Sequence, residues 1–196
     1  MINFWWIRHA PVIDNDDCCY GSNEVACDTS DNLRFKRLVE KLPDNGIVFT
    51  SPLSRTIKTF EASRKNGFKL KSHFIDARII EQNLGDWTGM KYLRLSNLTK
   101  RLSIFNKNWL FAENFRPPNG ESFEDLYERV RLFINDLIKN SSEENIIIFS
   151  HGGPIRAAIL LASNMSGRKN LSHHVDNLSL TKIQYNNGWK VLSINS

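Results

Sequence analysis

Two histidines and two arginines follow predicted strands, and together these residue types can handle a phosphoryl group. Arg8 and His9 directly follow one apolar run of the chain. Arg55 comes shortly after a second such run, and His151 lies one residue beyond a third. The carboxyl ends of parallel strands meet at one edge of an open α/β sheet, where such proteins keep their active sites. The sequence therefore predicts a pocket for a phosphoryl group at this edge.

Phosphomonoester hydrolysis needs a nucleophile in line with phosphorus, cations on the equatorial oxygens and an acid for the leaving alkoxide. A neutral histidine is a nucleophile through one ring nitrogen when its other nitrogen donates a hydrogen bond, so His9 and His151 are the candidates. The planar guanidinium group of arginine binds two oxygens at once, which makes Arg8 and Arg55 the candidate clamp.

Glu81 is the candidate acid. It follows the apolar pair Ile79 and Ile80, which would desolvate the carboxyl group and raise its pKa. Gly152 and Gly153, just after the second histidine, allow backbone N–H groups to approach an anion at the start of a helix. Each piece alone is a weak indication of function. Their joint occurrence, each after a strand, indicates catalysis.

Strands and helices alternate along the chain, which predicts an α/β fold. Apolar runs predict strands at 2–7, 47–50, 72–76 and 146–150 and a closing hairpin over 178–194. Helical periodicity and capping residues predict helices over about 31–42, 53–65 and 154–164, and a long amphipathic helix that opens near 121. We expect a three-layer sandwich with a mostly parallel sheet and one antiparallel edge.

The chain of 196 residues fits a single domain over residues 1–196. Residues 88–118 show helical periodicity and no strand, so we expect a helical insertion over the active site. Aromatic residues in and beside the insertion could stack a flat leaving group, but aromatic residues more often pack cores, which is the interpretation we favour. They are Trp87, Phe105, Trp109, Phe111 and Phe115.

The composition favours a small anionic substrate. The net charge is +5, the basic residues are dispersed, and no nucleic-acid-binding module is present. No apolar stretch reaches the roughly 18 residues of a membrane span, and the first residues indicate a strand instead of a signal peptide. We therefore expect a cytoplasmic protein without nucleic-acid or membrane partners. The oligomeric state is not readable from the sequence.

Three cysteines, Cys18, Cys19 and Cys27, crowd one predicted loop. Their odd number and irregular spacing do not form a disulfide framework, and no nearby histidine completes a zinc site. We expect reduced thiols, and neither a metal nor a cofactor.

The chain resembles the histidine phosphatase superfamily, the phosphoglycerate mutase-like proteins, from Phe4 to about Ala162. The resemblance is carried by Arg8-His9-Ala10, Thr50–Arg55 with Thr59, Glu81 with Leu84–Gly89, Asn119–Ser122, and Ser150–Arg156. It implies that His9 becomes phosphorylated during turnover and that Glu81 is first the general acid and then the general base. It also implies four phosphate-contacting residues, namely Arg8, Arg55, His151 and, six positions after His9, Asn15.

The segment after the first histidine departs from the common family pattern. Gly, an acidic residue and Ser or Thr are usual there, but Ala10, Pro11 and Val12 stand in this chain, so Val12 offers no hydroxyl to phosphate. Together with Cys19–Gly21, the run Arg8–Val12 looks like the α-ribazole phosphatase branch, which acts late in cobalamin synthesis.

We therefore expect a metal-independent phosphomonoester hydrolase that acts through a phosphohistidine on a small phosphorylated metabolite, with α-ribazole 5′-phosphate as the candidate substrate. A phosphoglycerate mutase-type phosphotransferase and a catalytically silent phospholigand-binding module stay open as alternatives. A nucleic-acid-binding protein is a more distant one. The complete set of five core residues favours an enzyme.

Overall fold

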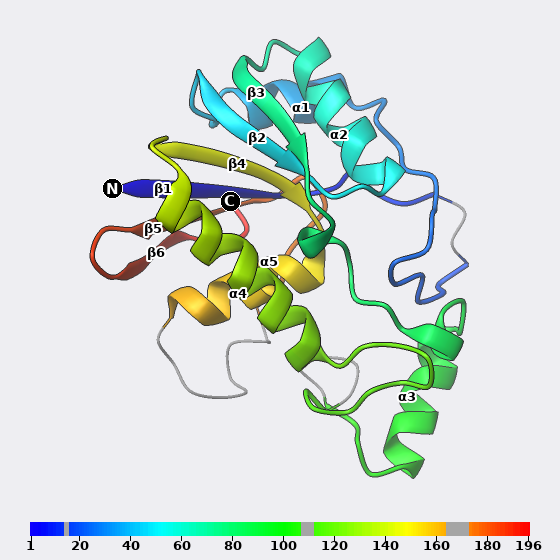
Figure 1. Cartoon of the computed structure of the whole chain (residues 1–196). Coiled ribbons are helices and arrows are strands. Elements are labelled where there is room, and N and C mark those ends of the chain that lie inside the picture. The colour runs from blue at the N-terminus through cyan, green and yellow to red at the C-terminus, as the bar shows by residue number, and fades with distance from the viewer. Residues whose placement is uncertain (14–15, 107–111, 164–172) are drawn as a thin grey trace.

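A mixed sheet forms the middle layer of the molecule (Figure 1). The computed structural model describes residues 1–13, 16–106, 112–163 and 173–196. Within them the strand order is β3-β2-β4-β1-β5-β6. The bounds are β1 Ile2–Arg8, β2 Gly46–Thr50, β3 Leu70–Ile75, β4 Asn145–Ser150, β5 Leu180–Tyr185 and β6 Trp189–Ser193. Strands β1 to β4 run parallel, whereas β5 and β6 form an antiparallel edge, so the predicted sheet is confirmed.

Helices cover both faces of the sheet, as the three-layer prediction requires (Figure 1). Helices α1 (Asn32–Val39) and α2 (Ser54–Lys65) pack on one face, and α4 (Phe123–Asn140) and α5 (Gly152–Ala162) pack on the other. Helix α3 (Tyr92–Arg101) lies apart from both faces, within the predicted insertion. Two short 3₁₀ helices, η1 (Ala77–Ile79) and η2 (Gly85–Trp87), precede it.

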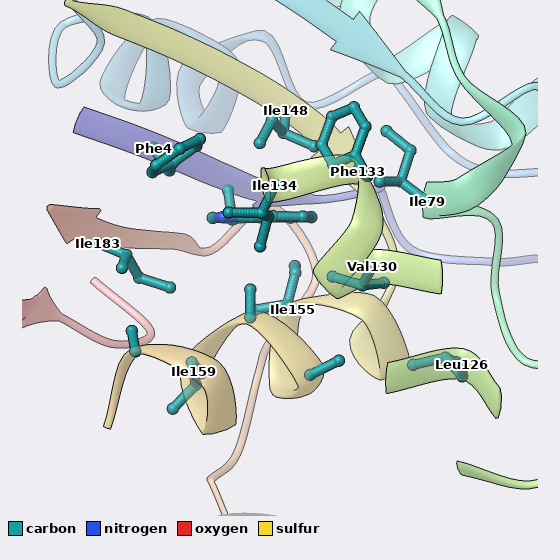
Figure 2. Packing of buried hydrophobic residues seen from close by; sticks show 14 of the residues in the cluster. Phe4, Ile79, Leu126, Val130, Phe133, Ile134, Ile148, Ile155, Ile159 and Ile183 are labelled. Carbon is teal, nitrogen blue, oxygen red and sulfur yellow. The ribbon is translucent and has the colours of Figure 1, made fainter. Parts of the chain in front are cut away.

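Alternating strand residues build two cores, because successive side chains of a strand point to opposite faces. In β4, Ile147 and Phe149 join the core under α1 and α2, whereas Ile146 and Ile148 join the core under α4 and α5. Figure 2 shows Phe4 of the sheet in this second core with Ile155 of α5. The central strands of the sheet are therefore buried from both sides, and its carboxyl edge is free to carry polar groups.

Local signals set the helix starts. Asp31 caps α1 by accepting the Arg34 N–H, as predicted, and Ser122 opens α4 through a capping box with Asp125. The helix expected from Pro154 begins two residues earlier, at Gly152, because both glycines are helical and the proline occupies the first turn.

Other element ends also differ from the sequence prediction. Helix α1 ends at Val39, three residues before the predicted Leu42, and β3 begins at Leu70 instead of Ser72. Strand β5 begins at Leu180, because Leu178 has a positive φ of 60° that extended backbone does not accommodate. No helix among the described residues is both long and apolar enough to cross a membrane.

Candidate active site

A pocket of about 300 Å³ opens beyond the carboxyl edge of the sheet. It is lined by Arg8, Cys19, Tyr20, Gly21, Glu81, Gln82, Leu84, Tyr92, Gly152 and Arg156. The other predicted site residues, His9, Arg55 and His151, are fully buried. The half-buried ring of Tyr20 links the two sets, since its centroid lies 6.4 Å from the His9 ring and 5.1 Å from the Arg55 guanidinium carbon.

His9 is held as a neutral imidazole with one ring nitrogen unengaged. Its Nδ1 lies 2.7 Å from the Ala10 carbonyl oxygen, which can only accept, so Nδ1 carries the hydrogen. Its Nε2 is buried and has no hydrogen-bond partner among the described residues. Burial, together with the charges of Arg8 and Arg55, holds the pKa of His9 well below its usual value of 6.5. Nε2 therefore presents a lone pair, as a nucleophile requires.

His151 is neutral for a similar reason but has both ring nitrogens engaged. The Nε of Arg55 donates to its Nδ1 at 3.2 Å, so the remaining hydrogen sits on Nε2, which donates to the Ser51 hydroxyl at 2.8 Å. Burial and the Arg55 charge lower the pKa of His151 well below 6.5. Its ring centroid lies 5.2 Å from that of His9, so the pair of Arg55 and His151 lies beside His9.

The two arginines differ in how they are held. Arg55 donates to the carbonyl oxygens of Asn23 at 2.6 Å and Gly21 at 2.9 Å, which ties it to the loop after β1. Arg8 donates from Nη1 to the Val175 carbonyl at 2.6 Å, and its buried Nε has no partner within the described part of the chain. Arg8 thus brings an unsatisfied cationic donor to the pocket wall.

Glu81 is docked against the first turn of α5. Its carboxylate accepts the Gly153 N–H at 3.1 Å and the N–H of Gln82 at 2.9 Å. A Cβ on Gly153 would lie 2.3 Å from the Glu81 Oε1, so only glycine permits this approach. A Cβ on Gly152 would lie 3.8 Å from the Arg8 Nε and 3.9 Å from the Glu81 Oε2, so both side chains approach the same backbone position from the pocket.

Sequence reasoning assigned no role to several pocket residues. Arg156 is the last residue of the family motif Ser150–Arg156, and it lies four positions after Gly152. Residues four apart lie on one face of a helix, so this spacing could have identified Arg156 as a pocket residue. Tyr20 and Tyr92 carry no periodic signal, because a loop and the first residue of α3 bring them to the pocket. Asn15 lies outside the described residues.

The three cysteines are free thiols, as expected. Cys19 lines the pocket, and burial raises the pKa of its thiol to about 12. Among the described residues no three His, Cys, Asp or Glu side chains gather as a metal site.

Two of the five aromatic residues in and beside the insertion pack in a core. Trp87 stacks on Phe115 with ring centroids 5.3 Å apart, in a small core with Leu84 and Leu95. Phe105 is exposed, and Trp109 and Phe111 lie outside the described residues. The residue of the insertion that lines the pocket is Tyr92.

Residues 4–196 match the model of the histidine phosphatase superfamily (branch 1). The chain belongs to this superfamily. The resemblance inferred from the strand-end motifs is thereby confirmed.

The chain is similar to curated proteins, some of which carry phosphatase names. It is 32% identical, over 70% of its length, to a Hydrogenobacter thermophilus protein provisionally named phosphoserine phosphatase 2. It is 27% identical, again over 70% of its length, to the bifunctional protein Rv2228c of Mycobacterium tuberculosis. The chain spans 65% of the first relative and 36% of the second.

Solved structures share the fold along the whole chain. The α-ribazole phosphatase of Shigella flexneri superposes with a TM-score of 0.81 at 24% identity, covering 100% of this chain and 96% of its own. A mycobacterial glucosyl-3-phosphoglycerate phosphatase superposes with a TM-score of 0.81 at 20% identity, covering 100% of both chains. At such identities the likeness establishes the fold.

Proposed function

We propose that this histidine phosphatase hydrolyses small phosphomonoesters through a phosphohistidine on His9, without a metal ion. The observation that carries the proposal is the unengaged Nε2 of His9, buried between two arginines with its pKa held low. A structural histidine would satisfy both ring nitrogens, as His151 does. An unsatisfied buried nitrogen is instead what an incoming phosphorus would engage.

In the first step the lone pair of the His9 Nε2 attacks phosphorus, and the bond from phosphorus to the ester oxygen breaks. Glu81 protonates the departing alkoxide from the wall of the pocket. Arg8 and Arg55 stabilise negative charge on the equatorial oxygens, and the first turn of α5 directs its positive end toward the same region. His151 keeps Arg55 in place through the Nε contact.

In the second step water attacks the phosphohistidine. Glu81, now a carboxylate, takes a proton from the water as the nitrogen–phosphorus bond breaks, and the electron pair returns to Nε2. Inorganic phosphate leaves, and His9 is again neutral. The Nδ1–H bond to the Ala10 carbonyl persists throughout, and it stabilises the positive charge that the ring carries while phosphorylated.

The pocket supports a compact leaving group. Its volume of about 300 Å³ accommodates a phosphoryl group with a nucleoside- or sugar-sized remainder. Tyr20 and Tyr92 line it beside Cys19 and Gly21, so part of the motif that suggested α-ribazole phosphatase contributes to the pocket wall. We therefore propose α-ribazole 5′-phosphate as the first physiological substrate to test. We also propose that the chain is a single domain in which residues 88–118 form an insertion at the pocket.

The deciding experiment is a phosphomonoester panel assayed with EDTA present, comparing the wild type with His9→Ala. We expect metal-independent turnover that His9→Ala abolishes, because the His9 Nε2 is the one buried imidazole nitrogen without a hydrogen-bond partner among the described residues. Quenched samples of the wild type should contain acid-labile, base-stable phosphoprotein. The exposed His174→Ala serves as the matched control and should retain activity. Full activity of His9→Ala would refute the mechanism.

Glu81→Gln tests the acid–base role separately. General acid–base catalysis contributes about 10²- to 10⁴-fold, so we expect a loss in that range for alkyl phosphates with little change in phosphate affinity. The exposed Glu124→Gln should behave as the wild type. Conversion of 3- to 2-phosphoglycerate above hydrolysis would identify a mutase instead, and tight phospholigand binding without turnover would identify a silent binding module.

A further inference from the structure

Arg129 of α4 reaches the backbone of the segment that carries Glu81. Its Nη1 donates to the Arg78 carbonyl at 2.8 Å, and its Nη2 donates to the carbonyl of Glu81 itself at 3.2 Å. The side chain is 19% exposed, so these bonds are shielded from competing water. Arg129 therefore bridges the two ends of the turn that leads into the candidate acid.

Glu121 completes this connection. It binds the Arg129 guanidinium through both carboxylate oxygens, at 2.6 Å from Nη2 and 3.1 Å from Nε. The same carboxylate accepts the Asn83 N–H at 2.9 Å, and the Glu121 carbonyl accepts from the Gln82 amide at 3.0 Å. Three consecutive residues, 81 to 83, are thus attached to one end of α4 by this pair.

We propose that Arg129 is a positioning residue that aims the Glu81 carboxylate at the leaving-group oxygen. The inference rests on the proposed function. The carboxylate is held from α5 through the Gly153 N–H, and the backbone of Glu81 is held from α4 through Arg129, so two rigid helices fix both ends of one side chain. Proton transfer requires a donor within hydrogen-bond reach, and a small displacement is costly.

Position 129 requires arginine because the contacts there use several N–H donors of one side chain. Nε and both terminal nitrogens are engaged, toward two carbonyls and a bidentate carboxylate. Lysine has a single nitrogen without the planar fork, so it cannot span the carbonyls of Arg78 and Glu81 while pairing with Glu121.

The test uses leaving groups that differ in their need for a proton. The value of kcat/KM is measured for p-nitrophenyl phosphate, whose anion leaves unaided, and for the best alkyl phosphate of the panel, whose alkoxide needs protonation. Because kcat/KM reports events up to the first irreversible step, it isolates phosphorylation of His9. We expect Arg129→Met to lower kcat/KM about 100-fold for the alkyl phosphate and less than about threefold for p-nitrophenyl phosphate.

The control is Arg131→Met, because Arg131 lies on the same helix, is paired with Glu128 and has a side chain that is 38% exposed. Arg131→Met should leave kcat/KM unchanged for both the alkyl phosphate and p-nitrophenyl phosphate. A double mutant tests whether Arg129 acts through the carboxylate: in a Glu81→Gln background, Arg129→Met should cause no further selective loss.

An equal loss for both substrates, no loss for either, or a further selective loss in the Glu81→Gln background would overturn the inference. If circular dichroism shows that Arg129→Met does not fold, Arg129→Lys is tested in its place. That variant must show the selective loss for the alkyl phosphate, and a non-selective result with it would also overturn the inference. Failure of the proposed function is recognised differently, because Glu81→Gln itself would then lack leaving-group selectivity.

Discussion

His9 and His151 lie with ring centroids 5.2 Å apart, and both are fully buried beside Arg55. Burial disfavours the charged form of each ring, and protonation would also place a second positive charge next to a buried guanidinium group, so the pKa values of both histidines are lowered well below 6.5. The neutral imidazole that the proposed role of His9 requires therefore lowers the stability of the folded protein in acid. In the unfolded chain both histidines titrate near pH 6.5.

This difference predicts how stability depends on pH. Below pH 6.5 the unfolded state binds protons that the folded state does not, so the free energy of unfolding rises with pH in this window. The contribution of the histidines is fully present above pH 6.5. It declines as the pH falls toward their folded pKa values, by about 1.4 kcal/mol per histidine for each pH unit. Urea denaturation at pH 7.5 and pH 5.5 measures this decline in the free energy of unfolding.

The matched variant is His9→Asn, which keeps a side chain that can donate to the Ala10 carbonyl and removes one titrating group. Between pH 7.5 and pH 5.5, we expect the free energy of unfolding of this variant to fall by about 1 kcal/mol less than that of the wild type. Equal losses would contradict the assignment of His9 as a buried neutral imidazole.

At the scale of elements, the start of α5 decides the geometry of the site. The helix begins with two glycines because Glu81 and Arg8 approach its backbone closely. Its first N–H groups have no partner within the helix, so the Gly153 N–H is available to the Glu81 carboxylate. A helix with ordinary side chains at these positions would push the acid away from the pocket.

Gly153→Ala tests this requirement. Alanine favours helix by roughly 1 kcal/mol over glycine, so helix propensity alone predicts a stabilised protein. We expect instead that kcat/KM for alkyl phosphates falls more than about tenfold, because the new Cβ would lie 2.3 Å from the Glu81 Oε1 and 3.0 Å from the Leu126 Cδ1. The control is Gly188→Ala, where a Cβ meets nothing within 4 Å and activity should be unchanged. Normal activity of Gly153→Ala would show that Glu81 is not fixed by this contact.

At the scale of the whole molecule, one aromatic side chain of α4 joins the sheet to the Glu81 segment. The buried Phe133 ring makes edge contacts with Trp6 at 6.3 Å and with Phe49 at 5.3 Å between ring centroids. The Arg78 guanidinium lies 5.4 Å from the same ring. Packing of α4 on the sheet therefore supports both the fold and the segment that presents the acid.

Phe133→Ala should cost about 3–5 kcal/mol of unfolding free energy, since it removes a large buried ring that its neighbours cannot fill. The neighbouring Leu132 is 50% exposed on the same helix, and Leu132→Ala should cost far less. Chemical denaturation of both variants measures the difference, and similar costs would show that Phe133 is not a core residue.

Much of the fold could be predicted from local patterns. The apolar runs located β1, β2 and β4, whose buried residues alternate between the two cores, and the turn around Asn187 marked the closing hairpin. Element ends were less predictable, because glycine and proline at 152–154 allowed an earlier helix start than periodicity suggested.

What the sequence by itself determined is the set of reactive groups at strand ends, because strand periodicity and chain order place Arg8, His9 and His151 at one edge of the sheet. The tertiary structure alone decided that the Nε2 of His9 is unengaged whereas both ring nitrogens of His151 are engaged. It also decided that Tyr20 and Tyr92 reach the pocket and that Arg129 donates to the Glu81 carbonyl from 48 positions away. These features depend on contacts between distant segments, and no local pattern of residues encodes them.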